Sequence, residues 1–280
     1  MMVTAKANLM LESLSLMGYD ALGIGDDDLT FGMEFLGELS KKAPFPFLSS
    51  NLVDAESGKP VFQSSLIKEV NGLKVGIFSL LAPDAFSGPQ DPRLKGLTLQ
   101  NPIETAQRIA RELKPNTDLI ILLSHLGYPK DVEMAQTVPG IHIIVGGHSG
   151  VSLTYPPIIK DTVILQSPMK GMYFGQFELT FFSGSAGFYN TATTRSLENN
   201  LSNLRSRSNR KEAPKTEREQ YQRMIGDAER SIKQMEGKNQ FSNAIFPLSD
   251  QIKEDPRGLK LLEDFKTHFQ EPDKTSPPKQ

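Results

Sequence analysis

Short apolar runs alternate with helical patterns from Asp20 to about Phe182. Two of the runs, DLIILLSH (118–125) and IHIIVGGH (141–148), are continuous apolar segments, which is typical of strands that are buried on both faces. The segment IETAQRIARELK (103–114) has apolar residues at a spacing of three to four, which predicts an amphipathic helix. Mixed strands with interleaved helices indicate an α/β sandwich.

Other segments complete this expected arrangement. VFQSSLIKEVNGLKVGIFSLLAP (61–83) predicts a hairpin, because Asn71-Gly72 is a strong two-residue turn signal between alternating stretches. TVILQSP and YFGQFELTFF predict two closing strands, paired as a hairpin across MKGM. The remaining expected elements are an amphipathic helix that Gly18 closes, a strand at ALGIG (21–25), a helix at DLTFGMEFLGELSKKA (28–43) and a strand at PFPFLSSNLV (44–53).

The composition changes near Ser183, where small and polar residues begin. GSAGFYNTATTRS predicts a linker or surface loop, and DKTSPPKQ at the end has the composition of a disordered tail. Between them, a narrow apolar stripe predicts a helix that lies on a surface or pairs with another helix; it consists of Tyr221, Met224, Ile225, Ala228, Ile232 and Met235. We therefore expect a partial α/β domain (1–183), a polar linker and helix (184–240) and a helical or disordered tail (241–280).

Composition and charge exclude several classes of protein. The chain of 280 residues has 31 basic and 33 acidic side chains, so broad attraction to nucleic-acid polymers or membranes is not expected. It has no cysteine, which excludes disulfides and thiolate metal ligands. Without a stretch of about 18 apolar residues we expect no membrane span, and the first residues lack the pattern of a signal peptide.

Polar residues at the ends of apolar strands are the candidates for chemistry. His125 and His148 each follow a buried strand, and the run Asp26-Asp27-Asp28 follows a third. In open α/β sheets ligands bind at the carboxyl ends of strands, and imidazole together with carboxylate suits divalent Zn, Mn, Fe or Mg. A divalent cation would also offset the repulsion between adjacent aspartates. A lone histidine at such a place is more often satisfied by a backbone carbonyl, but two in similar contexts favour a site.

Five segments in this order and spacing resemble the calcineurin-like metallophosphoesterases, in particular the bacterial 5′-nucleotidase and 2′,3′-cyclic phosphodiesterase branch: MGYDALGIGDDDLTFG, FPFLSSNLVD, VNGLKVGIFSLLAP, LLSHLG and PGIHIIVGGHSG. The resemblance covers about residues 10 to 182. It implies a two-layer mixed β-sandwich flanked by helices, here incomplete at the N-terminus and followed by a polar helical extension. It also implies a nucleotide-type phosphate ester as substrate, two divalent metal ions that activate water, and a periplasmic location.

The same resemblance assigns roles to individual residues. Asp26, His125 and His148 match metal ligands, and Asp27 stands at the position of a catalytic histidine in the family motif G-N-H-E. Gly150 stands where the family has a further ligand, a His or Gln two residues after His148. In the family, two segments with the patterns D-x-H and G-D carry other ligands, and this chain begins after both of them. We therefore expect impaired catalysis. Asp28 is expected to act as a charge at the N-terminus of the following helix.

Two alternatives differ from the phosphoesterase hypothesis in class. One is a catalytically inactive module that keeps the sandwich for binding or as a spacer, with a partner domain or helix at 196–240. The other is a phospho-acceptor receiver domain, in which Asp84 would be the acceptor. The receiver domain is the weakest of the three, because it leaves the paired histidines at strand ends unexplained.

Overall fold

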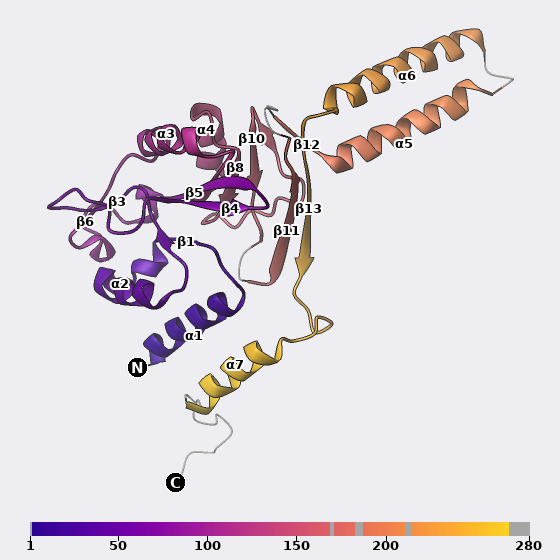
Figure 1. Cartoon of the computed structure of the whole chain (residues 1–280). Helices are drawn as coiled ribbons and strands as arrows, with labels where there is room; N and C mark the ends of the chain where they lie inside the picture. The colour runs from indigo at the N-terminus through magenta and orange to yellow at the C-terminus, as the bar shows by residue number, and fades with distance from the viewer. Residues whose placement is uncertain (1, 169–170, 183–186, 211–213, 269–280) are drawn as a thin grey trace.

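The computed structural model of the chain describes residues 2–168, 171–182, 187–210 and 214–268 (Figure 1). Its centre is a six-stranded sheet in the order β4-β5-β7-β8-β10-β9. β5, β7, β8 and β10 run parallel, while β4 and β9 are antiparallel to their neighbours. The strands are β4 (Ser65–Val70), β5 (Leu73–Leu81), β7 (Leu119–His125), β8 (Ile143–Gly146), β9 (Ile158–Ile159) and β10 (Thr162–Leu165).

The hairpin β4–β5 confirms the expectation from Asn71-Gly72. Both turn residues have positive φ, 51° for Asn71 and 79° for Gly72, which is the conformation that a two-residue hairpin turn requires. One face of the sheet is covered by α3 (Pro102–Leu113) and α4 (Tyr128–Thr137). The apolar stripe of α3 faces this core, whose fully buried members include Phe78, Leu80, Ile109, Leu122, Met134 and Ile144.

A second sheet packs on the opposite face, so the expected two-layer sandwich with flanking helices is confirmed (Figure 1). It contains β11 (Tyr173–Thr180), β13 (Asn239–Pro247) and β12 (Phe188–Asn190), in that order. Apolar side chains fill the space between the sheets: Val75, Leu119, Ile143, Val163, Phe188 and Phe241. β11 pairs with β13 and not with β10, so the hairpin that we expected between β10 and β11 is wrong.

The segment after residue 186 also differs from the expectation of a linker. Phe188–Asn190 forms β12, and α5 (Thr191–Ser208) follows at once, begun by Asn190, whose side chain accepts a hydrogen bond from Ala192 N. Small polar residues suggested a loop, but the buried Phe188 anchors this segment to the core. Residues 241–247 belong to β13 and not to a helical tail, because they pair with β11 along their whole length, while β12 pairs with the start of β13.

The expected polar helix is α6 (Lys215–Met235), and it pairs with α5 as a helical hairpin inserted between β12 and β13 (Figure 1). Ile225 and Ala228 of its stripe are buried. The division of the chain at residues 183 and 240 stays a prediction, although strands on both sides of these positions share one sheet. The tail from residue 273 lies outside the described residues.

The N-terminal part forms a third apolar cluster beside the main sheet, with Leu11, Ile24, Leu29, Leu36, Phe47 and Leu81 among its members. Here α1 (Met2–Leu16) lies next to α7 (Pro256–His268). The expected helix at 28–43 is split into a short 3-10 helix, η1 (Asp27–Leu29), and α2 (Gly32–Lys42), because Gly32 has a φ of 83°. The remaining elements are β1 (Leu22–Gly23), β2 (Phe47–Leu48), β3 (Leu52–Asp54), η2 (Pro83–Ala85), η3 (Pro92–Leu94), β6 (Leu97–Leu99) and η4 (Lys114–Asn116). In the described part of the chain, no helix combines the length and the apolar character that crossing a bilayer requires.

Candidate metal centre

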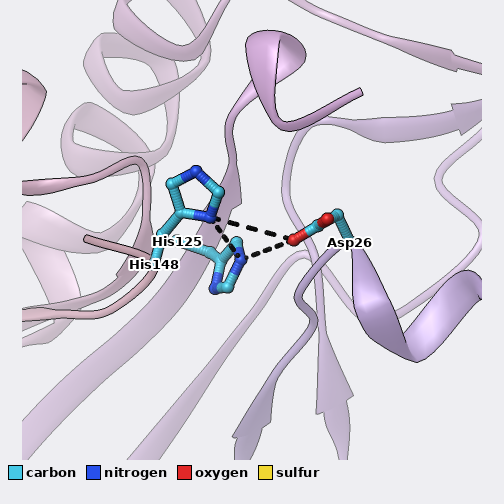
Figure 2. Close-up of side chains that lie close together, drawn as sticks. All are labelled: Asp26, His125 and His148. Carbon is cyan, nitrogen blue, oxygen red and sulfur yellow. Dashed lines mark hydrogen bonds and ion pairs between the residues drawn. The ribbon is translucent and has the colours of Figure 1, made fainter. Parts of the chain in front are cut away.

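Three strand ends bring Asp26, His125 and His148 together (Figure 2). His125 is the last residue of β7, and His148 follows β8 by two residues. β7 and β8 are parallel and in register up to Ser124 and Gly146, so their carboxyl ends lie at the same edge of the sheet. Asp26 arrives from the loop after β1. The sequence expectation that these three side chains converge therefore agrees with the geometry.

The donor atoms of the three side chains lie within 4.8 Å of one another. His125 Nε2 is 2.9 Å from Asp26 Oδ1 and 3.2 Å from His148 Nδ1. His148 Nδ1 is 3.8 Å from the same carboxylate oxygen, and the two imidazole rings meet edge to face. Figure 2 shows the three polar atoms turned toward a common centre.

The backbone around the cluster is shaped to permit this approach. Gly25 packs so closely on His125 that an added Cβ would lie 2.9 Å from the imidazole Cε1 atom. His148 has a φ of 67°, in the left-handed region that favours glycine, so its position has a cost in backbone strain. Gly147 N donates to Ser124 O at 2.8 Å and ties the loop after β8 to the end of β7. Strain of this kind at converging polar groups is typical of functional sites.

The donor set suits one divalent ion. Two imidazole nitrogens and one carboxylate oxygen are the three-ligand pattern of catalytic zinc sites, and Mn and Fe accept the same donors. Hydrogen bonds now join these atoms, so an ion would take the place of a shared proton. Among the residues that the structure describes, this is the single group of three or more such side chains close enough for an ion. The assignment of the three residues as metal ligands stays a prediction.

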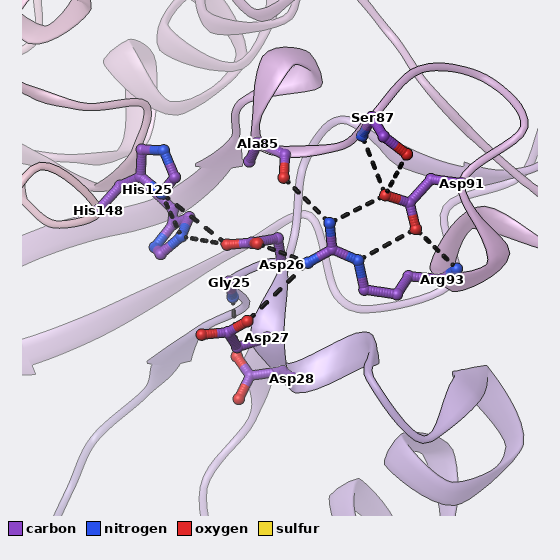
Figure 3. A network of polar contacts seen from close by, with 10 residues as sticks. All are labelled: Gly25, Asp26, Asp27, Asp28, Ala85, Ser87, Asp91, Arg93, His125 and His148. Carbon is purple, nitrogen blue, oxygen red and sulfur yellow. Dashed lines mark hydrogen bonds and ion pairs between the residues drawn. The ribbon is translucent and has the colours of Figure 1, made fainter.

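Arg93 binds the other oxygen of Asp26, a contact that no pattern in the sequence indicated (Figure 3). Its Nη1 donates to Asp26 Oδ2 at 2.7 Å. Burial alone would raise the pKa of Asp26, but the hydrogen bonds with His125 and Arg93 outweigh burial and lower the pKa. One oxygen of Asp26 is therefore directed to Arg93 and the other to the histidines. The sequence Asp91-Pro92-Arg93 predicts a local turn. It does not predict a contact between Arg93 and Asp26, which lies 67 residues earlier.

The other two aspartates of the run lie outside the cluster (Figure 3). Asp27 has a side chain that is 99% exposed, and its carboxylate is 3.9 Å from Arg93 Nη1. Asp28 is turned inward and accepts a hydrogen bond from Gly25 N at 2.8 Å, while burial raises its pKa. Asp28 thus closes the loop that carries Asp26. It lies in the first turn of η1, but not at the N-terminus of α2, which begins at Gly32 and is the longer helix where its charge was expected.

A buried acid, Asp131, binds the residue that precedes His125. Asp131 of α4 has no exposed surface, and it accepts a hydrogen bond from the hydroxyl of Ser124, the residue before His125. The same hydroxyl accepts a hydrogen bond from Leu126 N at 3.2 Å, so it fixes the chain on both sides of His125. Burial raises the pKa of Asp131 to about 7, and the bond from Ser124 offsets only part of that effect.

Comparison with known proteins identifies relatives of this chain. The 5′-nucleotidase of Vibrio cholerae is 28% identical over 204 residues, which are 62% of this chain and 37% of that protein. Protein UshA of Escherichia coli is 29% identical over 150 residues, 49% of this chain and 27% of that protein. The chain thus spans about a third of the length of the curated relatives that it matches. No protein-family model matches.

Solved structures agree on the fold. The 5′-nucleotidase precursor of Thermus thermophilus superimposes with a TM-score of 0.66 at 21% identity, over 94% of this chain and 46% of that one. The calcineurin-like phosphoesterase YfkN of Bacillus subtilis superimposes with a TM-score of 0.62 at 16% identity, over 95% of this chain and 75% of that one.

The fold is therefore that of the calcineurin-like phosphoesterases. Within this class, the sequence is similar to the bacterial 5′-nucleotidases, which is the branch that the segments around Asp26, His125 and His148 indicate.

Proposed function

We propose that this chain carries the metal-binding part of a phosphoesterase that hydrolyses nucleotide-type phosphate esters. The observation that supports the proposal is the convergence of Asp26, His125 and His148 at the ends of strands in a phosphoesterase fold. The relatives that match in sequence are named 5′-nucleotidases, which suggests a nucleotide as the substrate. A nucleic-acid polymer is not expected as a partner, because the acidic and basic residues nearly balance.

In this proposal Asp26, His125 and His148 hold a divalent ion, either Zn, Mn, Fe or Mg. When bound, such an ion supplies positive charge that stabilises the phosphoryl group during displacement. Asp26 contributes a carboxylate whose Oδ1 faces both histidines. The strained backbone at His148 and the close contact of Gly25 with His125 preset the positions of the imidazoles.

Water activation by two metal ions, as the family resemblance implies, requires a second set of ligands. The described residues provide one cluster of three, and Arg93 already holds Asp26 Oδ2. By the family resemblance Asp27 stands at the position of the catalytic histidine, and its side chain is 99% exposed and lies outside the cluster. We therefore propose that hydrolysis by this chain is weak compared with that of a complete two-metal site.

The sequence relatives favour a phosphoesterase over a noncatalytic binding or spacer module. The receiver-domain hypothesis has no support from the fold, and Asp84 forms an ion pair with Lys130 beside the site. A periplasmic location stays the prediction that the family resemblance implies.

Metal titration tests the proposal directly. The chain is stripped with EDTA, dialysed and titrated with Mn²⁺ or Zn²⁺ by calorimetry, and we expect one ion per chain. Replacement His125→Ala or His148→Ala should weaken binding at least tenfold, because each removes one of three ligands. His268→Ala, which changes an exposed histidine on α7, is the matched control and should leave the affinity unchanged.

Hydrolysis of bis(p-nitrophenyl) phosphate, with and without the titrated metal, tests the second half of the proposal. We expect slow turnover that requires the ion and disappears in His148→Ala. Stoichiometric metal binding without any turnover would contradict a phosphoesterase and leave the metal site standing. Equal affinities in all the histidine variants would contradict the site itself.

A further inference from the structure

The guanidinium of Arg93 is fixed by several contacts besides its hydrogen bond to Asp26 (Figure 3). Its Nε donates to Asp91 Oδ1 at 3.1 Å and its Nη2 to Asp91 Oδ2 at 2.9 Å, a two-point contact between the guanidinium and the carboxylate. Nη2 also donates to Ala85 O at 3.1 Å, and the guanidinium carbon lies 4.8 Å from the centre of the Phe86 ring. A side chain with these contacts has lost most of its conformational freedom.

Asp91 is fixed in turn by the loop before it. The backbone N–H and hydroxyl of Ser87 both donate to Asp91 Oδ2, at 3.0 and 3.2 Å. The side chain of Asp91 is buried, and its hydrogen bonds lower its pKa far below the usual range, those from Arg93 contributing most. The contacts of Asp91 thus fix the position of the Arg93 guanidinium, whose Nη1 is directed to Asp26.

The two oxygens of Asp26 consequently have different partners. Nη1 of Arg93 binds Oδ2 at 2.7 Å, whereas Oδ1 faces His125 Nε2 at 2.9 Å. The terminal torsion of an aspartate is broad and nearly twofold, so without Arg93 either oxygen would serve. With Arg93 in place the carboxylate plane is set, and one oxygen points into the cluster.

We propose that Arg93, anchored by Asp91, is a positioning residue that orients Asp26 as a one-oxygen ligand for a single divalent ion. This inference rests on the proposed metal site. Partners of metal ligands typically change metal affinity by 10–100-fold when removed, because they preset the ligand. The positive charge of Arg93 acts in the opposite direction, since it repels a cation. Orientation and charge therefore predict opposite signs, and experiment can separate them.

The chain contains a matched control for this arrangement. Asp255-Pro256-Arg257 repeats the sequence Asp91-Pro92-Arg93 and forms the same local bonds, with Arg257 N and Nε donating to Asp255 Oδ1 at 2.8 and 3.1 Å. Arg257 Nη2 donates to Asp255 Oδ2 at 2.8 Å, but this side chain is 69% exposed and lies on α7, away from the cluster. The Asp-Pro-Arg sequence thus produces the two-point contact between arginine and aspartate in both places. Of the two arginines, Arg93 is the one that also binds Asp26.

The test compares Arg93→Lys, Arg93→Met and Arg257→Met in the full chain by Mn²⁺ titration. If Arg93 orients Asp26, both Arg93 variants weaken Mn²⁺ binding about tenfold, including the lysine that keeps the charge, and Arg257→Met has no effect. If Arg93 acted through its charge alone, Arg93→Met would bind more tightly and Arg93→Lys would match the wild type. That second result would overturn the inference.

Two further measurements keep the outcome independent of folding and of the proposed function. The visible absorption of bound Co²⁺ should change in Arg93→Lys, because it reports ligand geometry. A double-mutant cycle of Asp26→Asn and Arg93→Met in metal-free protein, followed by urea unfolding, should show a coupling of about tenfold in the unfolding equilibrium constant. Zero coupling in a chain that binds one ion would overturn the inference alone. A positive coupling in a chain that binds no ion would contradict the proposed function and limit Arg93 to orienting Asp26.

Discussion

At the scale of single residues, Asp131 is an unusual case, because a carboxylic acid lies in the core beneath a candidate metal ligand. Its Oδ1 receives the hydroxyl of Ser124, and its Oδ2 has no hydrogen-bond partner among the described residues. A Cβ added to Gly146 would lie 2.5 Å from that oxygen, so glycine is needed there to leave room for the acid. A buried oxygen without a partner favours the protonated form of the carboxyl group, which agrees with its raised pKa.

This acid predicts a pH dependence of stability. The folded protein holds the proton up to about pH 7, whereas the unfolded chain releases it near 3.8. The folded state therefore binds more protons between these values, and the free energy of unfolding falls as pH rises from about 4 to 7. Asp131→Asn keeps the shape without the titration, so it should remove this decline, which is at most about 4 kcal/mol. Urea unfolding at pH 5 and pH 8 measures the effect, with the exposed Asp250→Asn as control. A decline of equal size in Asp131→Asn would contradict the assignment.

At the scale of elements, the helical hairpin of α5 and α6 stands apart from the sandwich (Figure 1). The contact surface between the two helices, here called the seam, has few buried apolar side chains: Leu204 on α5, and Ile225 and Ala228 on α6. Long polar helices with a narrow apolar stripe gain most of their stability from such pairing. Arg205 and Glu229 add an exposed ion pair across the seam, which contributes little.

We therefore expect the hairpin to unfold separately from the sandwich when its seam is weakened. Ile225→Ala should cost about 2–4 kcal/mol and raise hydrogen exchange in residues 191–235, because it empties the centre of the seam. Met224→Ala, at the neighbouring exposed position, is the control and should change little. Exchange in β7 and β8 should stay the same in both variants. Loss of protection throughout the molecule in Ile225→Ala would show that the hairpin is part of the main folding unit.

At the scale of the whole molecule, β13 links the end of the chain to the core. Phe241 of this strand is 1% exposed, stacks on Phe177 of β11 with ring centres 5.4 Å apart, and lies in the layer between the two sheets. Phe241→Ala should cost about 3–5 kcal/mol and shift the urea midpoint of the whole sandwich. Phe246→Ala on the same strand, where the side chain is exposed, should cost less than about 1 kcal/mol. Similar costs for the two variants would contradict a structural role of β13 in the core.

Elements with local signals are predictable from the amino-acid pattern alone. The apolar runs at 118–125 and 141–148, the Asn71-Gly72 turn and the stripe on α3 each specify a backbone form within a few residues. All of these elements form, although the second run is a strand only over Ile143–Gly146. The candidates at strand ends followed from the same logic, because parallel strands deliver their last residues to one edge of a sheet. This logic groups His125 and His148, whereas Asp26 follows β1 of a separate two-stranded sheet and joins them as a third strand end that the family resemblance supports.

The partners of these elements depend on contacts between segments that are distant in the sequence. Residues 188–190 and 241–247 have no strong strand pattern. β13 forms because β11 pairs along its length, β12 forms because it pairs with the start of β13, and the main sheet offers both an apolar face. Arg93 likewise reaches Asp26 across 67 residues, and no local pattern encodes that contact. The physical reason is the same in both cases: hydrogen bonds along the nearby chain are set by local sequence, whereas burial and ion pairing depend on which distant segment arrives beside them.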